Sequence, residues 1–557
     1  ALPETWSHAN PVDIIGDAAA ERYRAAVAAV AADPGVDAVM VLNCPTGLAS
    51  PIEAAGAVAG LTTRGMIDGK PVLTCWLGDH TAREGRRILQ QAGLASFETP
   101  AAAATAVSYL SDWSRAQRAL MRVPSSGGED VAKNGDEVRA VFAAVAGEGR
   151  RMLTEPEAKT VISAYGIAVP ETVVAGSPAE AGKAAARLLQ DNENVVVKLL
   201  SKAISHKSDV GGVVLNLSTP EAAGAAAAAI ESRVRRHAPQ ADIQGYAVQP
   251  MVVRKHAQEL ILGMSNDPIF GPVVLFGAGG IAVEVMDDTA IALPPLDSVL
   301  AGDLIERTRI GRLLAGYRDR KPADRAAIAA ALKGLSQLIV DFPCIVSIDI
   351  NPLLADAAGT IALDARVEID PGRVDEVGPN PALAIRPYPD GWEKRIDAGP
   401  ARYDIRPIRP ADIALYSDFL ARIAPDDIRF RFLAQRKSFP HQMLVRLTQL
   451  DYAREMAFVA LDAITGELAA VGRLSSDPDR EKAEYALLVR TDLQGRGLGW
   501  ALLSQLVDYA RSEGIRRIEG FVLADNEKML ALCREFGFSV APSETEPGLC
   551  VAALDLA

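Results

Sequence analysis

The sequence is poor in cysteine, histidine and aromatic residues, and it contains no long apolar run. Its cysteines are odd in number and widely spaced, which argues against a disulfide framework and a zinc cluster and favours a reducing cytoplasm. They are Cys44, Cys75, Cys344, Cys533 and Cys550. No apolar stretch approaches the roughly 20 residues that a helix needs to cross a bilayer. A membrane-embedded protein is therefore not expected.

Basic residues are fewer than acidic residues. Lysine and arginine total 58 against 71 aspartates and glutamates, so the formal net charge is −13. This balance disfavours non-specific attraction to nucleic acid or to an anionic membrane. With 49% hydrophobic and 23% charged residues, the composition is that of a globular protein. The first residue is alanine, within what reads as a connecting segment, so we expect the chain to be part of a longer protein.

The 557 residues predict three or four domains at about 150 residues each. In residues 1–123 a helical pattern at 21–32 and apolar runs at 38–42 and 72–76 predict a parallel sheet with helices on both faces. A glycine- and serine-rich linker follows, and a second α/β region covers about residues 136–378. A proline-rich bridge leads to a last domain that begins near residue 402. The alanine-rich run at 222–230 predicts a helix. The fold class is α/β with several domains.

A glycine-rich turn in the last domain carries the strongest functional signal. Gln494, Gly495, Arg496, Gly497, Leu498 and Gly499 follow an apolar strand pattern at 485–489 and precede an amphipathic helix at 500–511. Such a turn directs unpaired backbone N–H groups and the positive end of a helix at one spot, which suits a pyrophosphate. Glu484, at the start of the same strand, is a candidate base. The alternative is an ordinary tight turn, where glycine is the least strained residue.

Three further features accompany this loop, and together they resemble the GNAT superfamily of acetyltransferases over residues 403–557. They are the small-residue helix face 501–503, the segment 524–529 and residues 535–538, which we expect to begin a strand. The resemblance implies that the glycine loop binds the acetyl-CoA pyrophosphate, with Asn526 also at the cofactor. Backbone groups of Leu488 and Val489 would pair with pantetheine and polarise the acetyl carbonyl.

In that family a strand glutamate is the base, and Glu484 occupies its place. A lysine amine with a pKa near 10.4 is almost wholly protonated at neutral pH, so it must lose a proton before it attacks the thioester. Glu484 would accept that proton directly or through water. Asp477, Asp479 and Glu481 compete for the role, but only Glu484 lies at the entry of the strand. Cys533 is more simply explained as a buried structural thiol.

The middle of the chain contains a second group of chemical residues. Lys198 ends an apolar run that begins at Val195, and His206 lies between it and a glycine pair at 211–212. Glu259 precedes a glycine-rich segment at 277–280. Asn351 and Asp364 offer oxygen atoms on neighbouring strand patterns, the type of ligand that Mg²⁺ accepts beside nucleotide phosphates.

The order of these motifs resembles the ATP-grasp domain of ADP-forming acyl-CoA synthetases and succinyl-CoA ligases over residues 136–375. The resemblance implies that Lys198 and Glu259 contact ATP or ADP and that Asn351 and Asp364 bind Mg²⁺. His206 matches a histidine that relays phosphate at the ATP site, although a structural histidine remains the alternative. Residues 1–123 resemble the flavodoxin-like ligase subdomain of the same synthetases.

Two parts of those ligases have no match in this sequence. None of the six histidines lies in a Ser-His-Thr-Gly-like loop, and no N-terminal Rossmann-like CoA-binding domain is found. A synthetase-like region followed by a GNAT domain resembles the large bacterial protein lysine acetyltransferases. That likeness implies acetyl transfer to lysines of target proteins such as acyl-CoA synthetases. The alternatives are an ATP- and Mg²⁺-dependent acyl-CoA ligase, or a middle region that senses acyl-CoA or nucleotide. Self-association is left open.

Overall fold

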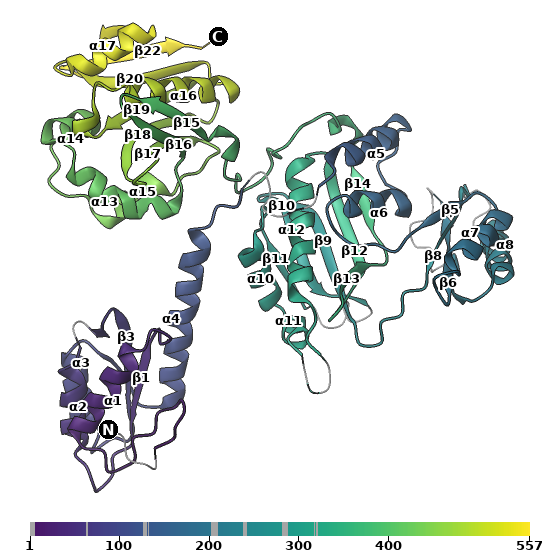
Figure 1. Cartoon of the computed structure of the whole chain (residues 1–557), viewed down its shortest axis with the longest axis horizontal. Coiled ribbons are helices and arrows are strands. Elements are labelled where there is room, and N and C mark those ends of the chain that lie inside the picture. Colours follow the sequence, from purple (N-terminus) through teal and green to yellow (C-terminus); the bar gives the residue numbers. More distant parts are fainter. Residues whose placement is uncertain are drawn as a thin grey trace. The chain divides into compact units, whose positions relative to one another are not determined.

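The structure is a computed structural model that describes residues 6–62, 65–125, 131, 133–201, 210–237, 242–280, 288–316, 318 and 321–556 (Figure 1). The chain divides into two compact units, Ala1–Leu120 and Met121–Ala557. No helix among the described residues is long and apolar enough to cross a membrane. The prediction of an α/β protein with several domains is confirmed.

The first unit is built around a small sheet. Strand β3 pairs in parallel with β1 and with β4, and a short β2 forms an antiparallel hairpin with β3. The predicted parallel sheet is therefore confirmed, and the helices pack on it through an apolar core that includes Trp76. The elements are α1 (Ala20–Ala32), β1 (Val39–Asn43), α2 (Pro51–Ala59), β2 (Met66–Ile67), β3 (Lys70–Trp76), α3 (Arg83–Gln91), β4 (Ala95–Phe97) and α4 (Pro100–Leu120).

The middle region, residues 133–375, begins with two helices and a four-stranded sheet in the order β5-β8-β6-β7. Helices α7 and α8 contact each other and pack on this sheet. The predicted alanine-rich helix is α8. The elements are α5 (Gly135–Gly147), α6 (Glu155–Ser163), β5 (Val173–Ala175), α7 (Pro178–Leu188), β6 (Val195–Leu200), β7 (Val213–Leu217), α8 (Pro220–His237) and β8 (Gly245–Pro250).

A larger antiparallel sheet completes the middle region. Its order is β11-β10-β9-β12-β13, with β14 also paired to β12, and α12 packs on it in one extensive core. The pairing of β12 with β9 shifts register between Ile350 and Leu353, so Asn351 lies in an irregularity of the strand. The elements are β9 (Gln258–Asp267), β10 (Gly271–Ala278), β11 (Thr289–Ala292), α10 (Ser298–Glu306), α11 (Arg309–Leu314), α12 (Arg325–Asp341), β12 (Ile345–Asp356), β13 (Gly359–Ala362) and β14 (Arg366–Ile369).

The C-terminal domain, residues 390–556, is one eight-stranded sheet in the order β15-β16-β17-β18-β19-β20-β22-β21. All neighbouring strands are antiparallel except β19 and β20. The elements are β15 (Lys394–Ala398), β16 (Ala401–Pro407), α13 (Ile413–Ala421), α14 (Pro425–Phe432), α15 (His441–Thr448), β17 (Glu455–Asp462), β18 (Leu468–Ser476), β19 (Lys482–Val489), α16 (Leu498–Ser512), β20 (Arg517–Leu523), α17 (Glu527–Phe536), β21 (Ser539–Pro542) and β22 (Leu549–Asp555).

Two local expectations for this domain differ from the structure. The start predicted at residue 403 falls inside β16, because the β15–β16 hairpin already belongs to the sheet. Residues 535–538 were expected to begin a strand, but Glu535 and Phe536 end α17 and Gly537 caps it with a φ of 101°. Glycine adopts this left-handed conformation without strain, so the sequence signal marks a helix end rather than a strand.

The two faces of the C-terminal sheet carry different helices. Helices α16 and α17 share a core with Tyr485 and Leu487 of β19, whereas α13, α14 and α15 share one with Leu488. Alternate side chains of a strand point to opposite faces, so Glu484 belongs to the face of α13–α15. A Cβ at Gly472 would lie 3.1–3.3 Å from side-chain atoms of Leu487, Leu502 and Leu506, so the glycine allows α16 to pack closely on β18.

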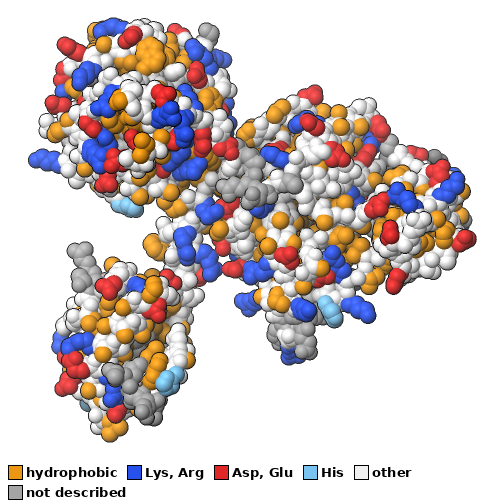
Figure 2. All heavy atoms as spheres, viewed as in Figure 1, with side chains coloured by type: hydrophobic (Ala, Val, Ile, Leu, Met, Phe, Trp, Pro, Cys, Tyr) orange, Lys and Arg blue, Asp and Glu red, His pale blue; other side chains and the backbone are white. Residues whose placement is uncertain are grey.

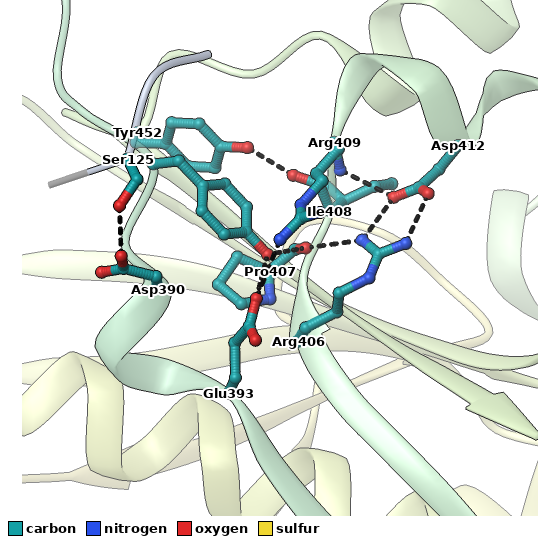
Figure 3. Close-up of polar contacts among 10 residues, drawn as sticks. Ser125, Asp390, Glu393, Arg406, Pro407, Ile408, Arg409, Asp412 and Tyr452 are labelled. Carbon is teal, nitrogen blue, oxygen red and sulfur yellow. Dashed lines mark hydrogen bonds and ion pairs between the residues drawn. The ribbon is translucent and has the colours of Figure 1, made fainter. Parts of the chain in front are cut away.

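Two connecting segments meet beside the C-terminal domain (Figure 3). The amide of Tyr388 donates to the carbonyl of Pro124 at 2.9 Å, and the Ser125 hydroxyl donates to the carboxylate of Asp390. Ser125 and Tyr388 also form a parallel β-bridge. The segment that leads into the middle region and the one that leaves it are thus joined to each other.

The joined segments are anchored to β16 through Tyr388. Its ring is buried, and its hydroxyl donates to the carbonyl of Pro407 at 2.9 Å. The guanidinium of Arg409 lies 4.4 Å from the ring centroid and pairs with Glu393 at 3.0 Å. The cation–π contact of Arg409 with the ring and the ion pair of Arg409 with Glu393 hold the segment on the domain surface.

Candidate functional site

Strands β19 and β20 separate part-way along their length. They pair in parallel at only three positions, and the last pair joins Glu484 to Glu519. Beyond it β19 continues to Val489 and β20 to Leu523, each still paired on its other side. In the described chain the backbone groups of residues 485–489 that face β20 have no strand partner. An extended ligand with amide groups can pair with such an exposed strand edge.

The glycine loop lies just beyond this separation. Gly495 and Gly497 have φ values of 75° and 94°, a region that favours glycine, and Gly497 caps α16 without a side-chain hydrogen bond. The first amides of a helix have no partner within it. The N–H groups of Leu498 and Gly499 and the positive end of a 15-residue helix therefore remain available to an anion.

Polar contacts hold the loop and its neighbours in place. Lys528 donates to the side chain of Gln494 at 3.1 Å, and Arg496 donates to the carbonyl of Asp492 at 3.0 Å. Asn526, predicted to contact the cofactor, caps α17 by accepting from the amide of Met529 at 3.2 Å. Lys528 and Arg496 add positive charge beside the loop, so the electrostatics favour a phosphate group there.

Glu484 is exposed and forms no hydrogen bond or ion pair with the described residues. Two of the other carboxylates have partners. Asp477 accepts from the amide of Lys482 at 3.3 Å, and Glu481 pairs with Arg516 at 2.9 Å. Asp479 lies in the turn before the strand. Its position on β19 distinguishes Glu484 from Asp479, and its lack of a partner distinguishes it from Asp477 and Glu481.

Cys533 lies in the core on the opposite face of the sheet. It is fully buried in α17, and its sulfur lies 2.9 Å from the hydroxyl of Tyr485. Burial raises the pKa of the thiol, which disfavours the nucleophilic thiolate. The interpretation of Cys533 as a structural residue is supported.

In the middle region Lys198 is held by a buried ionic cluster. Its ammonium donates to Glu155 at 2.6 Å and to the carbonyl of Leu363 at 3.0 Å. Lys159, one helical turn after Glu155, pairs with the same carboxylate at 2.9 Å and also donates to Gln249. Burial, partly offset by Glu155, lowers the pKa of Lys159 to about 8. Two lysines thus share one carboxylate in a dry environment.

The predicted magnesium ligands lie near this cluster. The amide of Leu363 donates to the carbonyl of Pro352 at 3.0 Å, which brings the residues after Asn351 beside Asp364. Asn351 accepts from the amide of Gly280 at 3.4 Å, and Asp364 accepts from Ala365 at 3.0 Å. Burial raises the pKa of Asp349 next to them, with Arg366 opposing that effect and Asp364 adding to it. The side-chain oxygen atoms of Asn351 and Asp364 are of the type that Mg²⁺ accepts.

Glu259 is also close to these residues. A Cβ placed on Gly280 would lie 2.0 Å from a carboxylate oxygen of Glu259, so only glycine permits this approach. His206 lies outside the described residues, and its role stays a prediction. Among the residues described, no group of three or more histidine, cysteine, aspartate or glutamate side chains could hold a metal.

Comparisons with known proteins identify both regions. Residues 144–369 match the model of an ATP-grasp domain, and residues 426–538 match that of the acetyltransferase (GNAT) family. The β subunit of an ADP-forming acetate–CoA ligase of Pyrococcus furiosus is 39% identical over 217 residues, which cover 39% of this chain and 91% of that subunit. The chain belongs to the ADP-forming acyl-CoA ligase family. It also contains a GNAT domain.

Two further relatives show how far the likeness extends. An ADP-forming acetate–CoA ligase of Archaeoglobus fulgidus is 34% identical over 366 residues, 66% of this chain and 51% of the ligase. The chain thus spans about half the length of that relative. An acetyltransferase of Pseudomonas aeruginosa is 36% identical over 151 residues, 27% of this chain and 81% of that protein.

Sequence reasoning missed Glu155, Lys159 and Gln249 of the ATP-grasp domain. A signal was present, because Glu155 and Lys159 follow the same helical stripe as the buried Ala158 and Ile162. Charged residues at i and i+4 on an apolar face of a helix indicate a buried pair rather than a solvated one.

Proposed function

We propose that this protein is a lysine acetyltransferase that transfers acetyl from acetyl-CoA to lysines of target proteins such as acyl-CoA synthetases. One observation carries the proposal: β19 and β20 separate directly after Glu484, beside a helix that follows a glycine loop and whose N-cap forms no side-chain hydrogen bond. An anion site, an exposed strand edge and the carboxylate of Glu484 would then lie along one path. A cytoplasmic location is proposed with it, from the scattered cysteines.

The proposed reaction uses these groups in turn. Gln494, Gly495, Arg496, Gly497, Leu498 and Gly499 hold the pyrophosphate, and the edge at Leu488 and Val489 pairs with pantetheine. Glu484 accepts a proton from the lysine ammonium, directly or through water, and the free amine attacks the thioester carbon. The C–S bond then breaks, the proton that the attacking nitrogen still has to lose passes to the thiolate, and CoA leaves as a thiol. Bringing amine and thioester together supplies much of the acceleration.

The test is acetyl transfer without ATP from radiolabelled acetyl-CoA to a purified acyl-CoA synthetase. Glu484→Gln is expected to lower the rate by about 100-fold or more while acetyl-CoA affinity is unchanged. Glu481→Gln is a matched control, since it removes an exposed carboxylate three residues away that pairs with Arg516. A Glu484→Gln variant as active as Glu481→Gln would exclude this base, and an inactive unmodified protein would refute the transferase.

A second candidate function rests on the ATP-grasp domain. Lys198 in its buried cluster and the nearby oxygen atoms of Asn351 and Asp364 support binding of ATP or ADP with Mg²⁺, with Glu259 and His206 as further contacts. In that role the chain would form acyl-CoA thioesters. Thioester formation that requires ATP and Mg²⁺ and is lost in Lys198→Met would establish the ligase. Nucleotide that binds but changes only the transfer rate would instead establish a sensor.

A further inference from the structure

One segment of the GNAT domain reverses the charge balance of the chain. Residues 425–455 run from the start of α14 through α15 to the start of β17, and they contain six lysines and arginines against four carboxylates, a net charge of +2. The whole chain has a net charge of −13. Lys and Arg side chains gather in groups on the C-terminal domain in Figure 2. The segment belongs to the face of the sheet that bears Glu484.

Most of these positive charges are not neutralised. Arg429 pairs with Asp525 at 2.6 Å. The others on the surface are exposed and form no ion pair with a carboxylate in the part of the chain that the structure describes. They are Arg436, Lys437, Arg446 and Arg454. Their combined field is therefore available to attract an acidic partner.

Arg431 is a cation close to the candidate base. It lies half-buried at the end of α14, which contacts β19, and it interacts electrostatically with Glu484, Tyr416 and Arg473. Arg473 is neutralised by Glu455 at 2.9 Å. Arg431 has no hydrogen bond or ion pair to any described residue, and its guanidinium lies 5.1 Å from the ring centroid of Phe432. Burial and Arg473 lower the pKa of its guanidinium, whereas Tyr416 and Glu484 raise it.

An arginine stays charged at any physiological pH and carries five N–H donors. Withdrawing such a group from water without an acceptor is unfavourable, so it is expected to serve a bound ligand. Arg431 and Glu484 act on each other without forming an ion pair. A carboxylate for the amine and a guanidinium for an anion thus lie near each other on one surface.

We propose that this surface, Arg431 with the exposed cations Arg436, Lys437 and Arg446, binds acceptor proteins whose target lysine lies among aspartates and glutamates. The lysine goes to Glu484, a carboxylate close to it in the acceptor pairs with Arg431, and the exposed cations attract the surrounding acidic surface. This inference names the acceptor class and rests on the proposed transferase function.

Binding of fluorescent peptides to the full chain tests the inference. Three lysine peptides are compared in the Glu484→Gln background with CoA present: acidic flanks, neutral flanks and basic flanks. The acidic peptide is expected to bind about tenfold more tightly than the neutral one, and higher salt should weaken this preference. Equal affinity for all three peptides would overturn the inference.

Variants separate this surface from a general charge effect. Arg431→Met is expected to abolish the acidic preference while leaving binding of the neutral peptide within about threefold, and Arg431→Lys should restore part of it. The exposed double variant Arg436→Glu with Lys437→Glu should invert the preference. Arg511→Glu makes the same type of charge reversal on α16, on the other face of the sheet, and should change nothing.

Transfer assays distinguish this inference from the proposed function. Acidic peptides that bind through Arg431 but receive no acetyl group in the unmodified protein would refute the transferase and leave the surface in place. Transfer that depends on Glu484 but proceeds equally on all three peptides would refute the acceptor preference alone.

Discussion

Replacing Glu155 by glutamine should expose how the ATP-grasp domain tolerates two buried lysines. The carboxylate of Glu155 lies 2.6 Å from the ammonium of Lys198 and 2.9 Å from that of Lys159, and the Glu155 side chain is only 2% exposed. Glutamine keeps the shape but removes the charge, so the two ammonium groups would face each other uncompensated. Breaking a buried ion pair in this way costs about 3–5 kcal/mol of folding free energy.

The pKa of Lys159 gives an independent magnitude. Its fall from 10.5 to about 8 means that the buried site disfavours the ammonium by about 3 kcal/mol even with Glu155 present. The folded chain releases this proton at lower pH than the unfolded chain. Between about pH 8 and 10.5 the unfolded chain binds more protons, so stability rises with pH there. Without Glu155 the pKa of Lys159 should fall further, so this rise of stability with pH begins at a lower pH. The folding stability lost in Glu155→Gln should therefore be larger at about pH 6 than at about pH 9.

Hydrogen exchange of peptides covering α6 and β6 measures the loss locally. Opening free energies, corrected for intrinsic exchange rates, should fall in Glu155→Gln, while peptides of β17 and β18 stay unchanged. Glu171→Gln is the control, because Glu171 pairs with Arg187 in an exposed surface contact that is worth at most about 1 kcal/mol. Protection in Glu155→Gln within about 1 kcal/mol of the unmodified protein at both pH values would refute the reasoning.

Three further outcomes are expected. Gly472→Val should destabilise the GNAT domain by about 1–3 kcal/mol in urea unfolding, because the new side chain would press on Leu487; unchanged stability would show that α16 can move away. Cys533→Ser should keep the acetyl-transfer rate within about threefold, since the thiol is buried against Tyr485, and a loss of about 100-fold would contradict a structural role. Lys198→Met should weaken ATP binding in calorimetry by about tenfold or more, and unchanged affinity would remove Lys198 from the nucleotide site.

Local features of the candidate site were predictable from the sequence. The strand at 485–489, the glycine loop and the following helix depend on residues close together in the chain, and the structure has β19 and α16 where the pattern predicts them. The separation of β19 from β20 was not predictable. Their pairing joins Glu484 to Glu519, which are distant in sequence, and no local pattern determines where a long-range pairing stops.

The same limit applies to the middle region. The apolar run before Lys198 predicted a buried strand, and β6 confirms it. The burial of Glu155 was missed because the capping box of Thr154 and Glu157 marks a helix start, where acidic residues are normally solvated. The Glu155 side chain is buried because Lys198 of β6 packs against it. Helix propensity does not include this tertiary contact.

The bridge between Ser125 and Tyr388 has a consequence for how such a chain can arise and be rebuilt. The two segments run in the same direction at this bridge. The chain therefore enters the middle region and leaves it at neighbouring positions, and after Tyr388 it continues into the GNAT domain. A gene segment that encodes residues 126–387 could therefore be gained or lost in one step, with a few linking residues in its place. Its loss would leave residues 1–125 joined almost directly to the GNAT domain.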